Sequence, residues 1–211
     1  MTIEYLENVD STQSYLKLRL AENSIQSPYA VVSKMQTDGK GSRNNSWLGL
    51  SGNLFLSFAI PVKKLPKDLR LESASIYFAY LLKEILNEHG SAVWLKWPND
   101  FYINNLKIGG MITNVSNDDF ICGVGINLLR HPTGSAKLDI KIDIEKLLEE
   151  YFMNIDKSNE WKKVFSKYKL EFHKSKNFST HKNNLKFSLG DALLECDGSI
   201  TINGERMYSL R

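Results

Sequence analysis

Residues that could bind or activate a substrate gather in the segment Lys-Trp-Pro-Asn-Asp at positions 96–100. It combines a cation, an aromatic ring, two polar side chains and a proline, which must end a strand because it lacks an N–H. Lys107 lies seven residues beyond Asp100, across an Asn-Asn pair that is typical of a tight hairpin turn. Such a hairpin would bring the Lys107 ammonium beside the Asp100 carboxylate at a strand end, where ligands bind in α/β sheets. Without Lys107, an ordinary strand and turn would explain the segment equally well.

Two glycine-bearing segments indicate strands that something approaches closely. Gly109 and Gly110 follow soon after Lys107, and paired glycines weaken a strand, which usually marks contact with a ligand or another backbone. The segment Gly-Val-Gly-Ile-Asn at 123–127 repeats the pattern and ends in the amide of Asn127. Small residues in strands often only relieve packing, so this second segment is the weaker signal.

The loop at residues 36–47 carries glycines and basic residues that suit a phosphate or a carboxylate. Gly39 and Gly41 let backbone N–H groups approach an anion, and Lys40 and Arg43 add positive charge. The loop is neither a P-loop nor a dinucleotide fingerprint, because each motif lacks one of its required glycines here. Taken alone, a segment of this kind is by default a solvated surface loop.

The hydrophobic pattern places these residues among intermixed strands and helices. We expect a helix over residues 69–89, where apolar residues recur at helical spacing and Gly90 suits the position after the last turn. The same pattern predicts a short helix after the capping residues 10–12 and two amphipathic helices over residues 144–168. The expected strands are residues 3–6, 29–35, 53–61, 92–97, 101–103, 107–115 and 120–128.

The C-terminal part of the chain has a different pattern. From residue 186 onward, short apolar runs alternate with turns at Gly190, Asp197-Gly198 and Asn203-Gly204. We expect about three to four strands there, too small a unit to be stable alone. A boundary in the polar stretch 174–184 divides the chain into residues 1–175 and 176–211.

Composition and charge exclude several functional classes. The 211 residues are 42% hydrophobic and 24% charged, which is ordinary for a folded domain. A net charge of +3 with interspersed signs is weak for a nucleic-acid binder and fits an anionic substrate or an acidic partner. The N-terminus lacks a signal-peptide pattern, and no apolar run approaches the roughly 20 residues of a membrane helix. We therefore expect a soluble cytoplasmic protein without a membrane partner.

The histidines and cysteines show no metal-binding spacing, so we expect no metal site formed by the protein. Cys122 and Cys196 each lie in an apolar, strand-like run. This predicts buried thiols in a reducing compartment rather than a disulfide.

Taken in order along the chain, these segments resemble the biotin–protein ligase family. The resemblance covers residues 3–130 and rests on 10–12 (Asp-Ser-Thr), 36–47, 52–54 (Gly-Asn-Leu), 96–100, Lys107 with Gly109-Gly110, and 123–127. It implies an α+β fold with a mixed β-sheet flanked by helices, as in class II aminoacyl-tRNA synthetases, and a small C-terminal SH3-like β-unit. It also implies activation of biotin by ATP and Mg²⁺ to biotinyl-5′-AMP, followed by transfer to one lysine of a biotin carboxyl carrier protein.

The resemblance also assigns roles to individual residues. The residues expected to bind biotin are Ser11, Thr12, Gln36, Gly39, Gly41, Lys107, Gly109 and Gly110. Those expected to bind the nucleotide are Lys40, Arg43, Trp47, Asn99 and Asn127. Lys107, Asp100 and Arg43 are the expected catalytic residues. Lys107 would hold carboxylate and phosphate oxygens through both steps, and Asp100 would orient the attacking amine or take up its proton.

The chain departs from the family pattern in the loop, where Ser42 and Asn45 stand at positions usually occupied by arginine. Arg43 would then substitute from a neighbouring position. Because the pattern begins within the first dozen residues, we expect no DNA-binding domain and no DNA partner, and a monomer or weak homodimer. The alternatives are a lipoate or octanoate ligase or transferase of the same superfamily, and a non-catalytic binding module.

Overall fold

A computed structural model describes residues 1–42, 45–157, 159–182 and 185–209. Its centre is a seven-stranded mixed sheet, in which β1 and β2 pair in parallel and the other neighbours pair antiparallel. The strands in spatial order are β1 (Thr2–Val9), β2 (Tyr29–Gln36), β5 (Leu54–Pro61), β9 (Asp119–Ile126), β8 (Leu106–Ser116), β7 (Asp100–Ile103) and β6 (Trp94–Lys96). All seven strands expected from the sequence are present.

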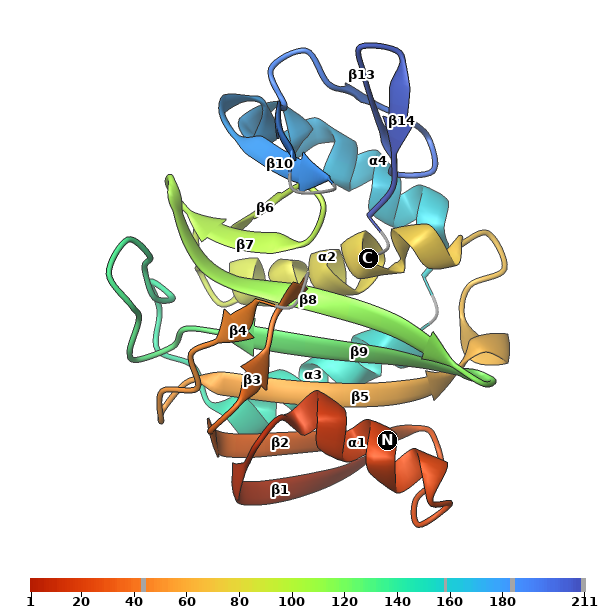
Figure 1. Cartoon of the computed structure of the whole chain (residues 1–211), viewed down its shortest axis with the longest axis vertical. Coiled ribbons are helices and arrows are strands. Elements are labelled where there is room, and N and C mark those ends of the chain that lie inside the picture. The colour runs from red at the N-terminus through yellow and green to blue at the C-terminus, as the bar shows by residue number, and fades with distance from the viewer. Residues whose placement is uncertain (43–44, 158, 183–184, 210–211) are drawn as a thin grey trace.

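Helices cover the two faces of this sheet unequally (Figure 1). Helix α1 (Thr12–Ala21) lies on the front face, where Leu16 packs against Val31, Ala59 and Ile121. Behind the sheet lie α2 (Ala74–Glu88) and α3 (Ile144–Asp156), and α4 (Trp161–Glu171) packs against α2 and β6. Alternate residues of each strand therefore face a large core behind the sheet and a smaller, partly open layer in front.

Aromatic side chains fill the core behind the sheet. The ring of Phe78 on α2 lies between Phe58 of β5 and Phe120 of β9, with centroid distances of 5.5 and 5.1 Å. The helix predicted over residues 69–89 begins later, with a 3₁₀ turn at Leu71–Ser73 before α2. The predicted end is confirmed, since His89 is the C-cap and Gly90 has a φ of +94°.

The C-terminal unit contains the expected strands, four from residue 185 onward, and one further strand before them. A hairpin of β10 (Ser179–Lys182) and β11 (Leu185–Ser188) precedes a three-stranded sheet of β12 (Leu193–Leu194), β13 (Ile200–Ile202) and β14 (Glu205–Met207). Strand β10 falls in the polar stretch assigned to the domain boundary. The stretch forms a strand because its backbone pairs with β11 while Thr180 is buried.

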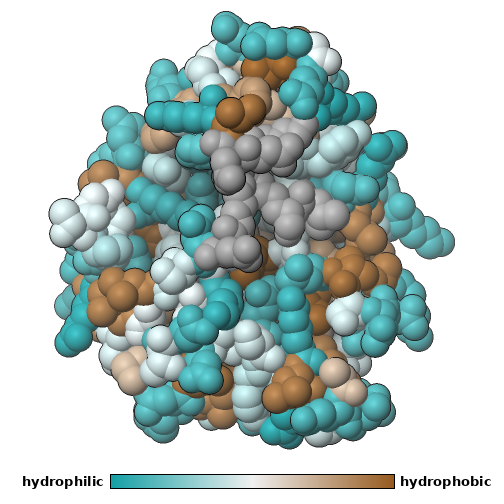
Figure 2. Space-filling view, in the orientation of Figure 1, coloured by the Kyte–Doolittle hydropathy of each residue, from teal (hydrophilic) through white to brown (hydrophobic). Residues whose placement is uncertain are grey.

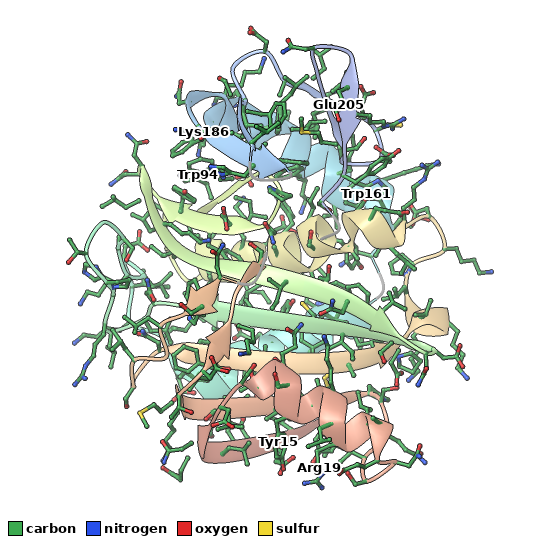
Figure 3. The ribbon with its side chains drawn as sticks, in the orientation of Figure 1. Tyr15, Arg19, Trp94, Trp161, Lys186 and Glu205 are labelled. Carbon is green, nitrogen blue, oxygen red and sulfur yellow. The ribbon has the colours of Figure 1, made fainter. Side chains whose placement is uncertain are left out.

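The core is continuous across the boundary predicted at residues 175 and 176. Leu189, Ile200 and Met207 belong to the same apolar cluster as Tyr168 and Trp161. The indole of Trp161, beneath the C-terminal strands in Figure 3, donates to the Cys196 carbonyl at 3.0 Å. The C-terminal unit thus shares its core with the helices behind the main sheet.

The cysteine prediction is half right. Cys122 is buried in β9 behind the sheet, but Cys196 is exposed, because it lies in the turn between β12 and β13. In the described residues, no helix is long and apolar enough to cross a membrane. Within the same residues, the structure shows no group of three or more histidine, cysteine or acidic side chains placed to hold a metal ion.

Candidate active site

The front face of the sheet is hollow where β8 and β9 carry glycine. A side chain at Gly123 would lie only 3.4 Å from Ser57 Oγ of β5 and 3.5 Å from Gln13 Cδ of α1. Gly110 and Gly125 extend this floor toward the hairpin formed by β3 (Gly39–Lys40) and β4 (Ser46–Trp47). Helix α1 and that hairpin flank the floor in Figure 1, which leaves a pocket between them.

The first turn of α1 forms one end of the pocket. Ser11 is the N-cap, and its hydroxyl accepts from the Ser14 N–H at 3.3 Å. The Thr12 N–H and hydroxyl both donate to Gln36 Oε1, at 2.8 and 3.1 Å, and the Thr12 hydroxyl also contacts Ser57 Oγ at 2.9 Å. These bonds join three residues predicted from the sequence, Ser11, Thr12 and Gln36, into one polar wall.

The opposite end carries the predicted lysine–aspartate pair. Lys107 Nζ lies 2.6 Å from Asp100 Oδ1, and Lys96 Nζ lies 3.3 Å from Asp100 Oδ2. The hairpin prediction is confirmed, since β7 and β8 pair antiparallel around Asn104, whose φ is +50°. Gly110 stands opposite Asp100 in this pair, and a Cβ there would lie 3.3 Å from the carboxylate and 3.4 Å from Lys107 Nζ.

The electrostatics of Asp100 follow from its neighbours. Burial acts to raise the pKa of this carboxyl, but Lys107 and Lys96 outweigh it and hold the pKa below the ordinary value of 3.8. Asp100 is therefore a stable carboxylate at neutral pH. Such a group accepts hydrogen bonds from ammonium groups well and takes up a proton poorly.

The asparagines predicted at the nucleotide have structural partners. Asn99 Nδ2 donates to the Met111 carbonyl, and the Asn99 carbonyl accepts from Met111 N–H at 2.9 Å. Asn127 Nδ2 donates to the Ala136 carbonyl at 3.0 Å, which holds the loop after β9. Asn99 lines the inner pocket and Asn127 an adjoining outer hollow, so both lie along the cleft.

The segment expected to be an irregular loop contains the β3–β4 hairpin. Gly39 pairs with Trp47, which brings the indole over the sheet against Gly125. The indole N–H of Trp47 is buried and has no hydrogen-bond partner among the described residues, and Lys107 Nζ lies 5.9 Å from the ring centroid. Lys40 is paired with Asp38 at the hairpin surface. The predictions for Arg43 fall outside the described residues.

Two connected hollows make up the cleft. The inner one, over the glycine floor, has a free volume of about 50 Å³, and the outer one beneath the hairpin has about 700 Å³. Gln36, Gly41, Trp47 and Lys107 line both, so the cleft is continuous from α1 to the loop after β9. The surrounding surface is mostly hydrophilic, with apolar patches scattered over it (Figure 2).

One predicted residue lies apart from the others. Gly109 is absent from the lining of both hollows, because a Cβ there would point at the Gly125 carbonyl, 2.6 Å away. Its lack of a side chain allows β8 and β9 to approach. Gly110, by contrast, lines the inner pocket directly.

The sequence interpretation missed Gln13 and Ser57, which complete the polar wall. Gln13 Nε2 donates to Asn114 Oδ1 at 3.0 Å, and Lys17 Nζ donates to the same oxygen at 2.9 Å. Burial lowers the pKa of Lys17. The one available signal was the serine that interrupts the apolar run of residues 54–60.

Comparisons with known proteins identify the family of this chain. The family described as "Biotin/lipoate A/B protein ligase family" matches residues 5–128. The chain is 39% identical to a biotin acetyl-coenzyme A carboxylase synthetase of Helicobacter pylori solved with bound biotinylated ATP. The TM-score is 0.94, over 98% of this chain and 99% of that one. The biotin protein ligase of Aquifex aeolicus in complex with biotin and ATP shares the fold, with a TM-score of 0.76 at 21% identity, over 100% of this chain and 96% of that one.

Curated relatives are longer than this chain. The bifunctional ligase/repressor BirA of Escherichia coli is 28% identical over 134 residues, which are 60% of this chain and 40% of that protein. BirA of Bacillus subtilis is 30% identical over 138 residues, 61% of this chain and 41% of that protein. The match thus spans about two fifths of these relatives.

Proposed function

Because this chain belongs to the biotin/lipoate A/B protein ligase family, we propose that it is a biotin–protein ligase. It activates biotin with MgATP to biotinyl-5′-AMP and pyrophosphate, and then transfers biotin to a lysine of a biotin carboxyl carrier protein. One observation carries the proposal. The Lys107–Asp100 pair faces a polar wall of hydroxyl and amide groups across a glycine floor, in one continuous cleft. The 39% identity to the Helicobacter pylori synthetase over nearly the whole chain supports it.

The polar wall suits the ureido end of biotin. Ser11 and Thr12 offer hydroxyls, and Gln36 uses its carbonyl oxygen for Thr12, which leaves its amide N–H groups to donate. A ureido group has one acceptor oxygen and two N–H donors, so it requires partners of both kinds. We assign the biotin tail to the glycine floor between this wall and Lys107, where Gly110 leaves space. Gly39 and Gly41 remain predicted contacts, whereas Gly109 supports the floor by letting β8 and β9 approach.

The first step needs a cation at the reacting centre. A carboxylate oxygen of biotin attacks the α-phosphorus of ATP, the bond to pyrophosphate breaks, and negative charge develops around phosphorus. Lys107 stabilises that charge from the junction of the two hollows. Mg²⁺ enters with ATP as part of the substrate. The nucleotide is assigned to the outer hollow, which Trp47 and Asn127 line. Lys40, Arg43 and Asn99 remain predicted contacts, and of these Lys40 and Asn99 line the adjoining inner hollow.

In the second step the amine of the carrier lysine attacks the carbonyl of the mixed anhydride. The bond from that carbonyl to the phosphate oxygen breaks, AMP leaves, and the nitrogen releases its proton to solvent. Asp100 accepts a hydrogen bond from the incoming amine and orients it. The lowered pKa of Asp100 favours this orienting role over proton uptake, since a group so acidic is a weak base at neutral pH.

The partner and setting follow from the same proposal. The carrier domain approaches the Asp100 end of the cleft. We propose a cytoplasmic monomer or weak homodimer.

Detection by streptavidin of a carrier domain incubated with this protein, biotin and MgATP tests the proposal. Biotin-dependent exchange of pyrophosphate into ATP is expected as the signature of the first step. Exchange that depends on lipoate or octanoate instead would identify the alternative ligase of the same family. Retention of biotinyl-5′-AMP without transfer to any carrier would indicate a non-catalytic binding module.

A further inference from the structure

Strand β6 is the last strand of the sheet, on the edge opposite β1. In the part of the chain that the structure describes, no further strand pairs with its outer backbone groups. The strand leads directly into the turn that carries Asn99 and Asp100, so any movement of β6 moves the carboxylate. What covers this edge matters for the active site.

Two side chains that follow one another along α4 and the 3₁₀ segment Phe172–Asn177 cover it. Ser175 Oγ accepts from the Trp97 N–H at 3.1 Å, and the Glu171 carboxylate lies near the Leu95 backbone, which acts to lower the pKa of that carboxyl against the opposing effect of burial. Residues 95 and 97 are two apart in an extended segment, so their N–H groups point the same way. Glu171 is the last residue of α4, and Ser175 lies in the 3₁₀ segment that follows it. The hydrogen bond from Trp97 to Ser175 therefore fixes this segment against the chain as it leaves β6.

Both acceptors are held firmly. Ser175 is fully buried, and Glu171 pairs with Lys83 of α2 at 3.0 Å, with side chains only 12% and 11% exposed. The Trp97 indole N–H donates to the Gly198 carbonyl at 2.9 Å, so the C-terminal unit holds the side chain of the same residue. A buried hydrogen bond of this kind defines one position for the strand.

We propose that Ser175, supported by Glu171, is a positioning residue for the lysine–aspartate pair. It holds β6 so that Asp100 meets Lys107 and the incoming amine in the reactive geometry. The inference rests on the proposed ligase function and deepens it. Residues 171 and 175 lie beyond the 5–128 region shared with the family. They act on the turn from a part of the chain that no motif identifies.

Kinetics of single variants test the proposal. Ser175→Ala removes the acceptor, and we expect kcat for transfer of biotin to a carrier domain to fall roughly tenfold. The KM for biotin is expected to stay within about twofold, because the polar wall is built on α1, β2 and β5, away from β6. Ser175→Thr, which keeps the hydroxyl, should restore most of kcat.

Ser166→Ala is the matched control, since Ser166 is an exposed residue of α4 whose hydroxyl bonds only the Lys163 carbonyl. Equal kcat values for Ser175→Ala and Ser166→Ala would overturn the proposal. So would equal losses in kcat and in biotin affinity, which a general structural defect produces. If Ser175→Ala does not fold, Ser175→Cys keeps the volume and weakens the acceptor. For Ser175→Cys we again expect a lower kcat with a nearly unchanged KM for biotin. A normal kcat in this variant would contradict the positioning role of Ser175.

Assays of the wild-type protein distinguish a failure of the positioning role from a failure of the proposed ligase function. If the wild type shows no biotin-dependent pyrophosphate exchange and no carrier biotinylation, the proposed function fails. If the wild type is active and Ser175→Ala matches its control, only the positioning role fails.

Discussion

At the scale of single residues, the site depends on how one carboxylate is shared between two cations. Lys107 binds one oxygen of Asp100 at 2.6 Å and Lys96 the other at 3.3 Å. Lys96 is nearly buried beneath the turn, whereas Lys107 lines the cleft. The two lysines thus differ in access to substrate, and Lys107 is the one able to contact reacting oxygens.

Lys107→Ala should reduce biotin-dependent pyrophosphate exchange by about 100-fold or more, because it removes the cation at the developing charge. Initial rates with and without biotin measure the effect, and Lys63→Ala, an exposed lysine of the 3₁₀ turn Val62–Lys64, is the control. Near-normal exchange in Lys107→Ala would remove this residue from the chemistry.

Asp100 should also shape the acid stability of the protein. Its folded pKa is lowered from 3.8, so its ion pairs stabilise the folded state above about pH 4, and this stability is lost as pH falls through the lower folded value. We expect Asp100→Asn to reduce the free energy of unfolding at pH 6 by about 1–3 kcal/mol. The difference in free energy of unfolding between wild type and variant should become smaller at acid pH, because the wild type then loses the same ion pairs. Urea unfolding of both proteins from pH 2 to 6 measures this difference. A difference that stays constant with pH would contradict stabilisation by ion pairs of Asp100.

At the scale of elements, the cleft exists because two neighbouring strands carry glycine at positions on their front face. Gly110 in β8 and Gly125 in β9 face the cleft, with Trp47 of the β3–β4 hairpin resting against Gly125. The hairpin lies over the sheet in Figure 1, and its Trp47 side chain lines both hollows. Hairpin and floor therefore form one functional unit.

Gly125→Ala tests this unit, since the new Cβ would meet Trp47 ring atoms at 2.7 Å and displace the hairpin. We expect KM for ATP to rise roughly tenfold because the wall of the outer hollow moves. Gly190→Ala, in the C-terminal unit and away from the cleft, is the control. An unchanged KM for ATP in a folded Gly125→Ala protein would separate Trp47 from nucleotide binding.

At the scale of the whole molecule, the C-terminal unit is joined to the catalytic core by apolar packing and by one buried carboxylate. Burial acts to raise the pKa of Asp197, but bonds from Ser199 and Arg206 outweigh it and keep the pKa low. Arg70, which precedes the 3₁₀ turn before α2, pairs with the same carboxylate at 3.2 Å. Asp197 thus ties the last strands to the helix behind the active site.

Asp197→Asn should destabilise the whole protein by about 1–3 kcal/mol, since it weakens charge-assisted bonds to a buried group. Because the core is continuous, we expect a single unfolding transition at lower denaturant rather than separate loss of the C-terminal unit. Fluorescence and circular dichroism in urea measure this, with the exposed Asp191→Asn as control. Two separated transitions would contradict a shared core.

The sequence by itself determined the features that depend on short stretches of chain. The seven strands of the sheet follow from local apolar patterns, and the meeting of Lys107 with Asp100 follows from a tight turn between adjacent strands. Ordered motifs also identified the family. These features could be predicted because the geometry of a hairpin, and the alternation of side chains between the two faces of a strand, are set within about ten residues.

Only the tertiary structure decided which distant residues join the site. Gln13 and Ser57 complete the polar wall, and Ser175 reaches β6 from 78 residues away. Strand β10 and the exposure of Cys196 likewise differ from expectation, because pairing with β11 and a place in a turn outweigh local composition. Such contacts arise from packing between elements far apart in sequence. The hydrophobic periodicity of each segment reflects only its local structure and therefore does not predict them.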